Sequence, residues 1–267
     1  MNHLIILPIV WPLLVALLTM LPPFDQNLLL RRCLSVGGSA VLLLLSVLLV
    51  LQSTDGPAQL YQLGNWPAPF GISLLLDQVS SLMLCLTAIL ALAASLYASS
   101  SEDERGPFFH ALLHFQVMGI NGAFLTADLF NLFVFFEVLL IASYSLLIHG
   151  GGKAKTKAAV HYVILNLVGS ALFLFALALI YGASGTLNML DLGAKVATLS
   201  DTQLQLLQAA VALLLVVFGL KAAVMPLHFW LGNAYSAASP AVAALFAIMT
   251  KVGIYSLLRV FAMVLQD

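Results

Sequence analysis

The sequence predicts an all-α polytopic membrane protein with about eight transmembrane helices. Of its 267 residues, 62% are hydrophobic and only 8% are charged, whereas about 25% of the residues in a soluble domain are charged. The apolar residues form long runs, and a helix crosses the hydrocarbon core of a bilayer in about 20 residues. Backbone groups in lipid must find hydrogen bonds inside the protein, and these runs are too long for barrel strands. Helical spans are therefore expected.

Short joins rich in Gly, Pro, Ser and charged residues separate the apolar runs, as expected of loops between helices. Residues 59–77 contain two prolines and an alternating tail, and they predict a short hairpin outside the bilayer. Residues 186–203 are too polar to span and predict an amphipathic helix on the membrane surface. The predicted spans are 3–21, 28–51, 76–98, 107–125, 127–149, 156–182, 204–230 and 236–263.

Basic residues occupy alternate joins. Arg31 and Arg32 lie between the first two spans, Arg105 between the third and fourth, and three lysines, at 153, 155 and 157, between the fifth and sixth. The positive-inside rule predicts that these joins face the cytoplasm and that the N-terminus lies outside it. The first run has neither a basic n-region nor a small-residue cleavage site, so it is interpreted as a retained span.

Nothing in the sequence predicts a metal, a cofactor or a nucleic-acid partner. The two cysteines, Cys33 and Cys85, have no metal-ligand spacing and predict no disulfide framework. The net charge of −1 gives no basic surface for nucleic acid. Cofactors and metals are therefore expected to be absent.

Three charged residues are placed deep inside predicted spans: Glu137 in the fifth, Lys221 in the seventh and Lys251 in the eighth. Each costs about 2.5–3.5 kcal/mol at mid-bilayer, so such residues usually have a function. A structural salt bridge is the alternative, but one acid cannot pair with two lysines. Burial favours the neutral forms, and a nearby opposite charge favours the ionised forms. The three residues therefore predict a proton relay.

The seventh span also contains a predicted break. Pro226 cannot donate a hydrogen bond to the carbonyl four residues earlier, so the helix is expected to be interrupted just after Lys221. Broken helices at membrane depth line cavities or ion sites. An ordinary proline kink is the alternative, and the adjacent lysine favours the functional interpretation.

Polar residues near these charges have two interpretations. Tyr144, His161, Asn166 and Ser170 could carry protons between the fifth and seventh spans, or they could simply join helices by hydrogen bonds. His110 and His114 share a helix face. Haem ligation would require partners on another helix at the same depth, so interface histidines that could also exchange protons with the cytoplasm are favoured.

Four segments resemble one family of membrane proteins: "LTADLFNLFVFFEVLLIASYSLLIHGGG", "HYVILNLVGSALFLFALALIYGASGTLNM", "GLKAAVMPLHFWL" and "AVAALFAIMTKVGIYSLLRV". They are similar to the antiporter-like membrane subunits that Mrp-type Na⁺(K⁺)/H⁺ antiporters share with proton-pumping NADH dehydrogenases (complex I). The sequence around Glu137 is most similar to the D-type branch of the Mrp antiporter subunits. The resemblance extends over essentially the whole chain.

The resemblance implies roles for four residues. Glu137 corresponds to a glutamate that modulates the charge of Lys221 on the broken seventh helix. Lys251 corresponds to a central relay lysine, and His228 to a residue that helps protons pass on the cytoplasmic side. It also implies partners: other subunits of a Mrp-type complex, H⁺, and Na⁺, K⁺ or Li⁺, in a bacterial plasma membrane.

The resemblance further implies a division of the chain. Residues 1–106 would form the first three helices with the external hairpin, and residues 107–267 the first five-helix antiporter-like repeat, a half-channel open to the cytoplasm. Family members are considerably longer and contain a second, inverted repeat, which is absent from this sequence. A fragment, a truncated gene and one piece of a split protein are all consistent with this length.

The leading prediction is a transporter subunit rather than an enzyme: a membrane subunit of a multisubunit monovalent cation/proton antiporter with a Glu–Lys–Lys relay. The first alternative is a proton-pumping subunit of a complex I-like oxidoreductase or a membrane-bound hydrogenase. A membrane-embedded lipid-linked transferase would need acidic clusters for Mg²⁺, and the only dense acidic run, "SEDERG", lies in a predicted cytoplasmic loop. A haem-bearing electron carrier and a helix scaffold are the remaining alternatives.

Overall fold

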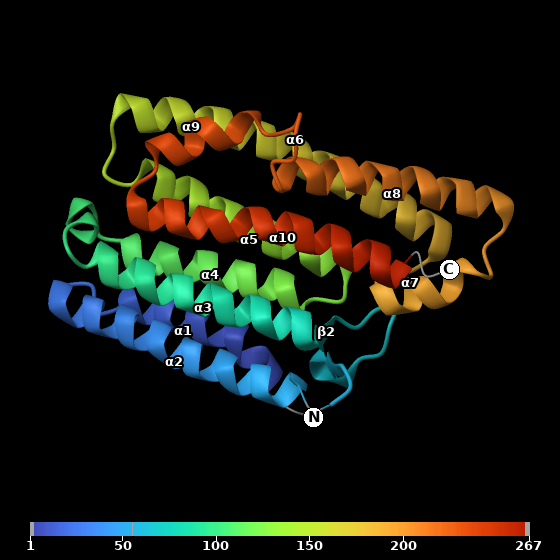
Figure 1. Cartoon of the computed structure of the whole chain (residues 1–267), viewed down its shortest axis with the longest axis horizontal. Helices are drawn as coiled ribbons and strands as arrows, with labels where there is room; N and C mark the ends of the chain where they lie inside the picture. The colour runs from blue at the N-terminus through green and yellow to red at the C-terminus, as the bar shows by residue number, and fades with distance from the viewer. Residues whose placement is uncertain (1–2, 55, 265–267) are drawn as a thin grey trace.

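The computed structural model describes residues 3–54 and 56–264, and it is mainly helical. Its helices lie side by side along the long axis of the molecule (Figure 1), with α1 to α4 on one side, α5 and α10 in the middle, and α6, α8 and α9 on the other. The 3₁₀ turn η1 His3–Ile6 leads into the first α-helix. The α-helices are α1 Leu7–Thr19, α2 Leu28–Thr54, α3 Gln78–Ala98, α4 Phe109–Leu125, α5 Leu129–Ile148, α6 Lys153–Ser184, α7 Met189–Val196, α8 Asp201–Lys221, α9 Phe229–Ala237 and α10 Pro240–Val264.

Six helices of the described residues are long and apolar enough to cross a membrane: α2, α3, α5, α6, α8 and α10. The stretch His3–Thr19 is apolar but shorter, and α4 has 17 residues. The prediction of a membrane protein built from helical spans is confirmed. The predicted end of the seventh span at residue 230 and start of the eighth at 236 are wrong, because α9 runs across both positions.

Helix α4 lies at the centre of the molecule and is buried except along one half-buried stripe, Leu112, Phe115 and Met118. It packs against α1, α3, α5 and α10. Gly119 allows the closest approach, because a Cβ atom there would lie 2.7 Å from the backbone nitrogen of Leu139 on α5. The absence of a side chain at this position lets the two backbones meet two residues from Glu137.

The predicted hairpin is present as two antiparallel strands, β1 Gln59–Gln62 and β2 Ser73–Leu76, joined through the 3₁₀ turn η2 Leu63–Asn65. The predicted surface helix is present as α7. Both lie at the same end of the molecule (Figure 1) and are tied to the α4–α5 join: the Ala127 amide donates to the Ser73 carbonyl over 2.9 Å, and the Met189 amide donates to the Ala127 carbonyl over 2.9 Å. These bonds hold three distant segments together.

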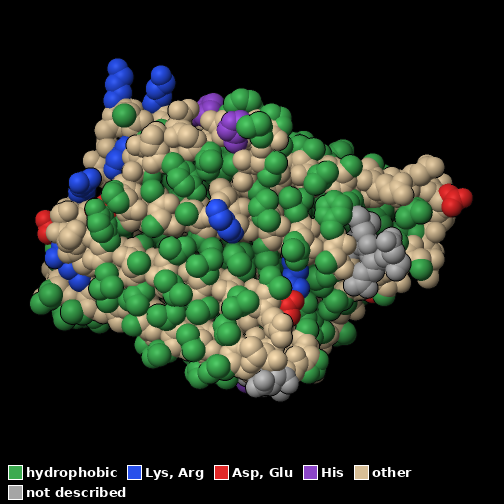
Figure 2. Space-filling view, viewed as in Figure 1, with side chains coloured by type: hydrophobic (Ala, Val, Ile, Leu, Met, Phe, Trp, Pro, Cys, Tyr) green, Lys and Arg blue, Asp and Glu red, His purple; other side chains and the backbone are tan. Residues whose placement is uncertain are grey.

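The opposite end carries the basic joins. The 3₁₀ turn η3 Glu102–Arg105 lies here, and Asp103 accepts two hydrogen bonds of 2.7 Å from Arg32. Ser239, between α9 and α10, donates to Glu102 over 2.7 Å. Figure 2 shows several Lys and Arg side chains gathered at this end, on the left, and hydrophobic side chains over the middle of the visible face. This distribution is typical of a protein that spans a membrane.

Candidate functional site

Three side chains from three helices form a polar bridge inside the protein. The Lys221 ammonium, on the last residue of α8, donates to the Ser170 hydroxyl of α6 over 3.2 Å. The Ser170 hydroxyl donates in turn to the Glu137 carboxylate of α5. Only 3% of Lys221 and 4% of Ser170 is exposed. The structure thus brings two predicted relay residues together through a third.

The walls of this bridge are aromatic. The Lys221 nitrogen lies 4.9 Å from the centroid of the Phe136 ring, at cation–π distance. Phe136 also packs against Phe173 and Phe218. The ring covers this side of the nearly buried Lys221, so a charge on its ammonium is stabilised by the bridge to Glu137 and by the ring face. Both hydrogen bonds point the same way, from lysine to serine to glutamate. The arrangement therefore allows Ser170 to accept a proton from Lys221 while it gives its own hydroxyl proton to Glu137.

The helix that carries Lys221 is broken, as predicted. Helix α8 ends at Lys221, and Ala223 takes a left-handed backbone conformation with φ of 55°. Such a conformation is uncommon for a residue with a side chain. Helix α9 begins at Phe229, and the Trp230 indole donates to the Leu220 carbonyl over 2.9 Å. The same carbonyl accepts from the Ala223 amide over 3.1 Å, so the indole adds a second hydrogen bond that ties α9 to the end of α8.

Lys251 lies midway along α10 and is exposed, unlike Lys221. Its ammonium donates to Thr250 over 3.3 Å. It lines a cavity of about 380 Å³ whose wall includes Ala222, the residue after Lys221. No direct hydrogen bond joins the two lysines in the described part of the chain, but this cavity extends from Lys251 to the break. The remaining lining residues are Val79, Met83, Thr250, Ile254, Tyr255 and Leu258.

His228, the fourth predicted site residue, lies in the break, directly before α9, and is exposed. Its ring stacks on Phe229 with the centroids 5.5 Å apart. This places an imidazole outside the core on the segment that follows Lys221. The described contacts of His228 do not include either lysine.

Of the four other polar residues that the sequence suggested as proton carriers, the structure places only one in the bridge. Ser170 lies in the bridge. His161 instead faces a groove on the outside of α6, and the Asn166 amide bonds to the Tyr162 carbonyl of its own helix. Tyr144 packs edge-on against Tyr162. Asn166 is as buried as Ser170, so it is the contact with Glu137 and Lys221 that sets Ser170 apart from the other three.

Arg259, near the C-terminal end of α10, is buried. Its guanidinium forms a salt bridge of 2.6 Å with Asp77 and donates to the Tyr255 hydroxyl over 2.6 Å. Asp77 caps α3 by accepting from the Ser80 amide. The arginine therefore joins α10 to α3 instead of reaching water.

A second polar cluster joins α2, η3 and α4 at the basic end. His110 contacts Asp103 over 3.0 Å and the Ser35 hydroxyl over 2.9 Å, and His114 contacts the same hydroxyl over 3.0 Å. Burial raises the pKa of Asp103, but hydrogen bonds from Arg32 and His110 outweigh it and hold that pKa below its usual value. The two histidines are thus helix-joining residues. The sequence prediction missed Ser35 and Asp103, because nothing in the sequence around these two residues marks them as partners of His110 and His114.

The comparisons with known proteins agree with this geometry. Residues 126–267 match the family model described as NADH:quinone oxidoreductase/Mrp antiporter, TM. The chain is 49% identical over 269 residues to a probable K⁺/H⁺ antiporter subunit, of the D type, from Rhizobium meliloti, covering 99% of this chain and 50% of that protein. It is 42% identical over 267 residues to the D-type Na⁺/H⁺ antiporter subunit of Bacillus subtilis, covering 99% and 53%. The chain thus spans about half the length of these curated relatives.

Solved structures of the same two kinds of complex also resemble this chain. A chain of the Mrp complex from Dietzia sp. DQ12-45-1b superposes with a TM-score of 0.89 at 34% identity, over 99% of this chain and 49% of that one. A chain of respiratory complex I from Thermus thermophilus superposes with a TM-score of 0.79 at 27% identity, over 97% and 53%. The helical arrangement described above is therefore similar to that of both assemblies.

Proposed function

Because this chain belongs to the NADH:quinone oxidoreductase/Mrp antiporter transmembrane family, we propose that it acts as a membrane subunit of a multisubunit monovalent cation/proton antiporter. Within that assembly it carries a proton half-channel in which Glu137, Lys221 and Lys251 form the relay. It is a transporter subunit and not an enzyme. The names of its relatives, D-type subunits of K⁺/H⁺ and Na⁺/H⁺ antiporters, support this proposal.

The observation that carries the proposal is the bridge from Lys221 through Ser170 to Glu137 at the end of a broken helix. A structural ion pair would need direct contact, whereas a hydroxyl between the two charges can both donate and accept. The bridge thus couples the protonation of the buried Lys221 to that of the half-buried Glu137. Coupling of this kind is what a relay requires.

The proposed path has three steps. Protons enter from the cytoplasmic side near the exposed imidazole of His228, a group that can both accept and donate a proton. They reach Lys221, whose charge depends on the proton position in the Ser170–Glu137 bridge. They then cross the cavity at Ala222 to Lys251, with water in the cavity as the carrier.

Orientation and partners follow from the charge distribution. The basic joins at one end support an N-terminus outside the cytoplasm of a bacterial plasma membrane. Lys251 is exposed on a helix at membrane depth, where an uncovered charge is costly. We therefore propose that further protein, from other subunits of a Mrp-type complex or from a longer form of this subunit, covers that face. Na⁺ or K⁺ would be the exchanged cation.

The test is cation-dependent proton movement in inverted vesicles from an antiporter-deficient host, measured with a pH-sensitive dye. The chain is expressed with the antiporter subunits encoded beside it, as wild type, Glu137→Gln, Lys221→Ala and Lys251→Ala. We expect each variant to lose the Na⁺- or K⁺-dependent signal. Lys195→Ala, which removes a lysine from the surface helix α7, should leave it unchanged. Full activity of a relay variant in an assembled complex would contradict the proposal.

A second candidate is a redox-driven proton pump. The superposition on complex I and, with a TM-score of 0.89 at 27% identity, on a chain of the membrane-bound sulfane sulfur reductase supports it. The same relay would then respond to electron transfer in other subunits. Proton movement driven by NADH or another reductant, with no response to Na⁺ or K⁺, would favour this function.

A further inference from the structure

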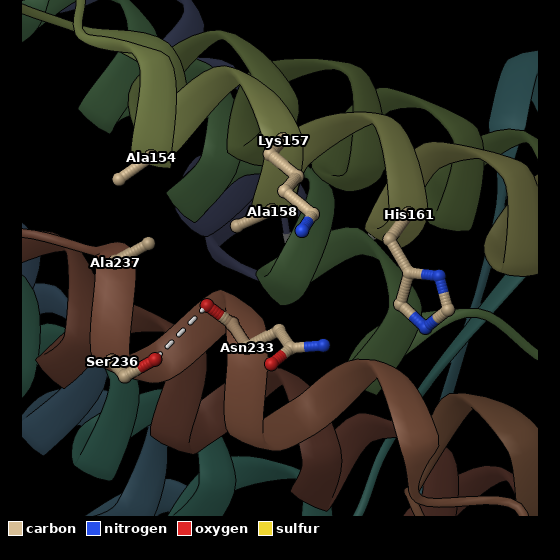
Figure 3. Close-up of a pocket in the computed structure, with 7 residues that line it drawn as sticks. All are labelled: Ala154, Lys157, Ala158, His161, Asn233, Ser236 and Ala237. Atoms are coloured by element: carbon tan, nitrogen blue, oxygen red, sulfur yellow. Dashed lines mark hydrogen bonds between the residues drawn. The ribbon is translucent and has the colours of Figure 1, made fainter.

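A groove runs between α6 and α9 at the basic end of the molecule, away from the relay. It has a volume of about 430 Å³ and is lined by Ala154, Lys157, Ala158, His161, Asn233, Ser236 and Ala237. Figure 3 shows Lys157 and His161 reaching from α6 toward the space beside Asn233 on α9. The three alanines keep the two helices close together without filling the groove. Every side chain long enough to reach its centre is polar.

The groove is positively charged and has no acid in its wall. Lys157 supplies an ammonium, His161 an imidazole, Asn233 an amide and Ser236 a hydroxyl. Lys153 lines an adjoining groove together with Lys157. Within the part of the chain that the structure describes, neither lysine has a carboxylate within 4.0 Å of its nitrogen. The Ser236 hydroxyl donates to the Asn233 carbonyl over 3.2 Å, and the Lys157 ammonium and the Asn233 amide are the donors available to an anion.

The outer face of α6 changes from cationic to apolar side chains along its length, which matches the change from the head group to the acyl chains of a phospholipid. Lys153, Lys157 and His161 follow one another at intervals of four residues, which places them on one helix face. The next turns of that face carry Ile164 and Val168, which are 56% and 54% exposed. From Lys157 to Val168 the helix rises by about 16 Å, close to the thickness of one leaflet of a hydrocarbon core of about 30 Å.

Helix α9 supplies the facing wall with the same polarity. Asn233 and Ser236 lie beside the cationic part of the α6 face. Phe229, one turn before Asn233, is 65% exposed, on the side of α9 that leads away from the basic end. Polar groups thus face polar groups, and apolar groups continue on both helices toward the membrane centre. A free phosphate would use only the first part of this surface.

We propose that this groove binds an anionic phospholipid of the leaflet at the basic end. Its phosphate would contact Lys157, with the Asn233 amide as a hydrogen-bond donor, and its acyl chains would lie along Ile164, Val168 and Phe229. Basic pockets between transmembrane helices recognise such head groups. The lipid would join α6, which carries Ser170, to α9, which follows the break. This proposal does not depend on the relay, because it concerns binding alone.

The test is native mass spectrometry of the purified, assembled complex after delipidation and addition of phosphatidylglycerol or phosphatidylcholine. We expect retained phosphatidylglycerol in wild type, and about fivefold weaker retention in Lys157→Gln, the factor typical of losing one lysine beside an anionic surface. Lys157→Arg, which keeps the charge, should retain the lipid. Arg105→Gln removes an exposed basic residue from the same end and serves as the matched control.

Three outcomes would overturn the proposal. An equal loss in Arg105→Gln would show that the attraction belongs to the whole basic surface. Displacement of phosphatidylglycerol by millimolar inorganic phosphate, with no effect of Ile164→Ala on retention, would identify a site for free anions only. Absence of bound lipid from the wild-type complex would show that another subunit fills the groove.

Discussion

The ammonium of Lys221 lies 3.2 Å from the hydroxyl of Ser170, which separates that lysine from Glu137. A lysine and an acid on neighbouring helices in a low-dielectric interior would attract each other directly. Here a neutral group between them accepts from one and donates to the other. The serine therefore sets how strongly the two charges sense each other, and it acts as a positioning residue for the proposed relay.

Ser170→Ala should lower cation-dependent proton transport by about tenfold or more, because hydrogen bonds to charged groups contribute about 1.5–3 kcal/mol. The measurement is dye quenching in inverted vesicles across a range of pH. We expect the pH at half-maximal activity to shift, since the bridge couples two titrating groups, and Ser170→Thr to restore it. Ser145→Ala, on the exposed side of α5, is the control. A uniform loss at every pH, matched by less protein, would indicate a structural role alone.

Trp230→Phe should destabilise the folded protein, because it removes the indole hydrogen bond that ties α9 to the Leu220 carbonyl and leaves that carbonyl with the Ala223 amide alone. A hydrogen bond of this kind contributes about 0.5–1.5 kcal/mol. Thermal unfolding of the detergent-purified protein, followed by loss of the monodisperse chromatographic peak, measures the effect. Trp66→Phe, in the hairpin and 67% exposed, should have little effect. Equal unfolding temperatures for the two variants would contradict this role of Trp230.

Gly253→Ala should disturb the break, because a Cβ atom at this position would lie 2.6 Å from the backbone nitrogen of Ala222. Overpacking of a tight interface costs about 1–3 kcal/mol, and here the neighbour is backbone that cannot rotate away. We expect lower thermal stability and reduced proton transport together. Gly182→Ala on α6 meets nothing within 4 Å and should be tolerated. The prediction fails if both alanine variants behave as wild type.

Asp103 should make the stability of the protein depend on pH in the acid range. Hydrogen bonds from Arg32 and His110 outweigh burial and lower the Asp103 pKa in the folded state. Its stabilisation is therefore complete above the unfolded value of about 3.9 and is lost as the pH falls through the lower, folded value. Asp103→Asn should lower the unfolding temperature at pH 7, and the difference from wild type should disappear as the pH falls through the lowered, folded pKa of Asp103.

The control for that experiment is Glu104→Gln. Glu104 also contacts Arg32, but its side chain is 58% exposed, and exposed ion pairs contribute little. A similar loss at pH 7 in both variants would mean that Arg32, rather than the buried carboxylate, is responsible. A difference for Asp103→Asn that persists unchanged at low pH would contradict the assigned protonation.

By itself, the sequence determined the membrane class, the helical architecture and the hairpin within residues 59–77, because hydropathy and turn residues act locally. It also identified Glu137, Lys221 and Lys251, since a charge inside an apolar run is visible without any coordinates, and the break after Lys221, since Pro226 cannot continue a helix. Only the tertiary structure decided which faces meet. Ser170 reaches Glu137 and Lys221, Arg259 turns inward to Asp77, and Lys251 stays exposed, because these contacts depend on how each helix is rotated and packed against its neighbours.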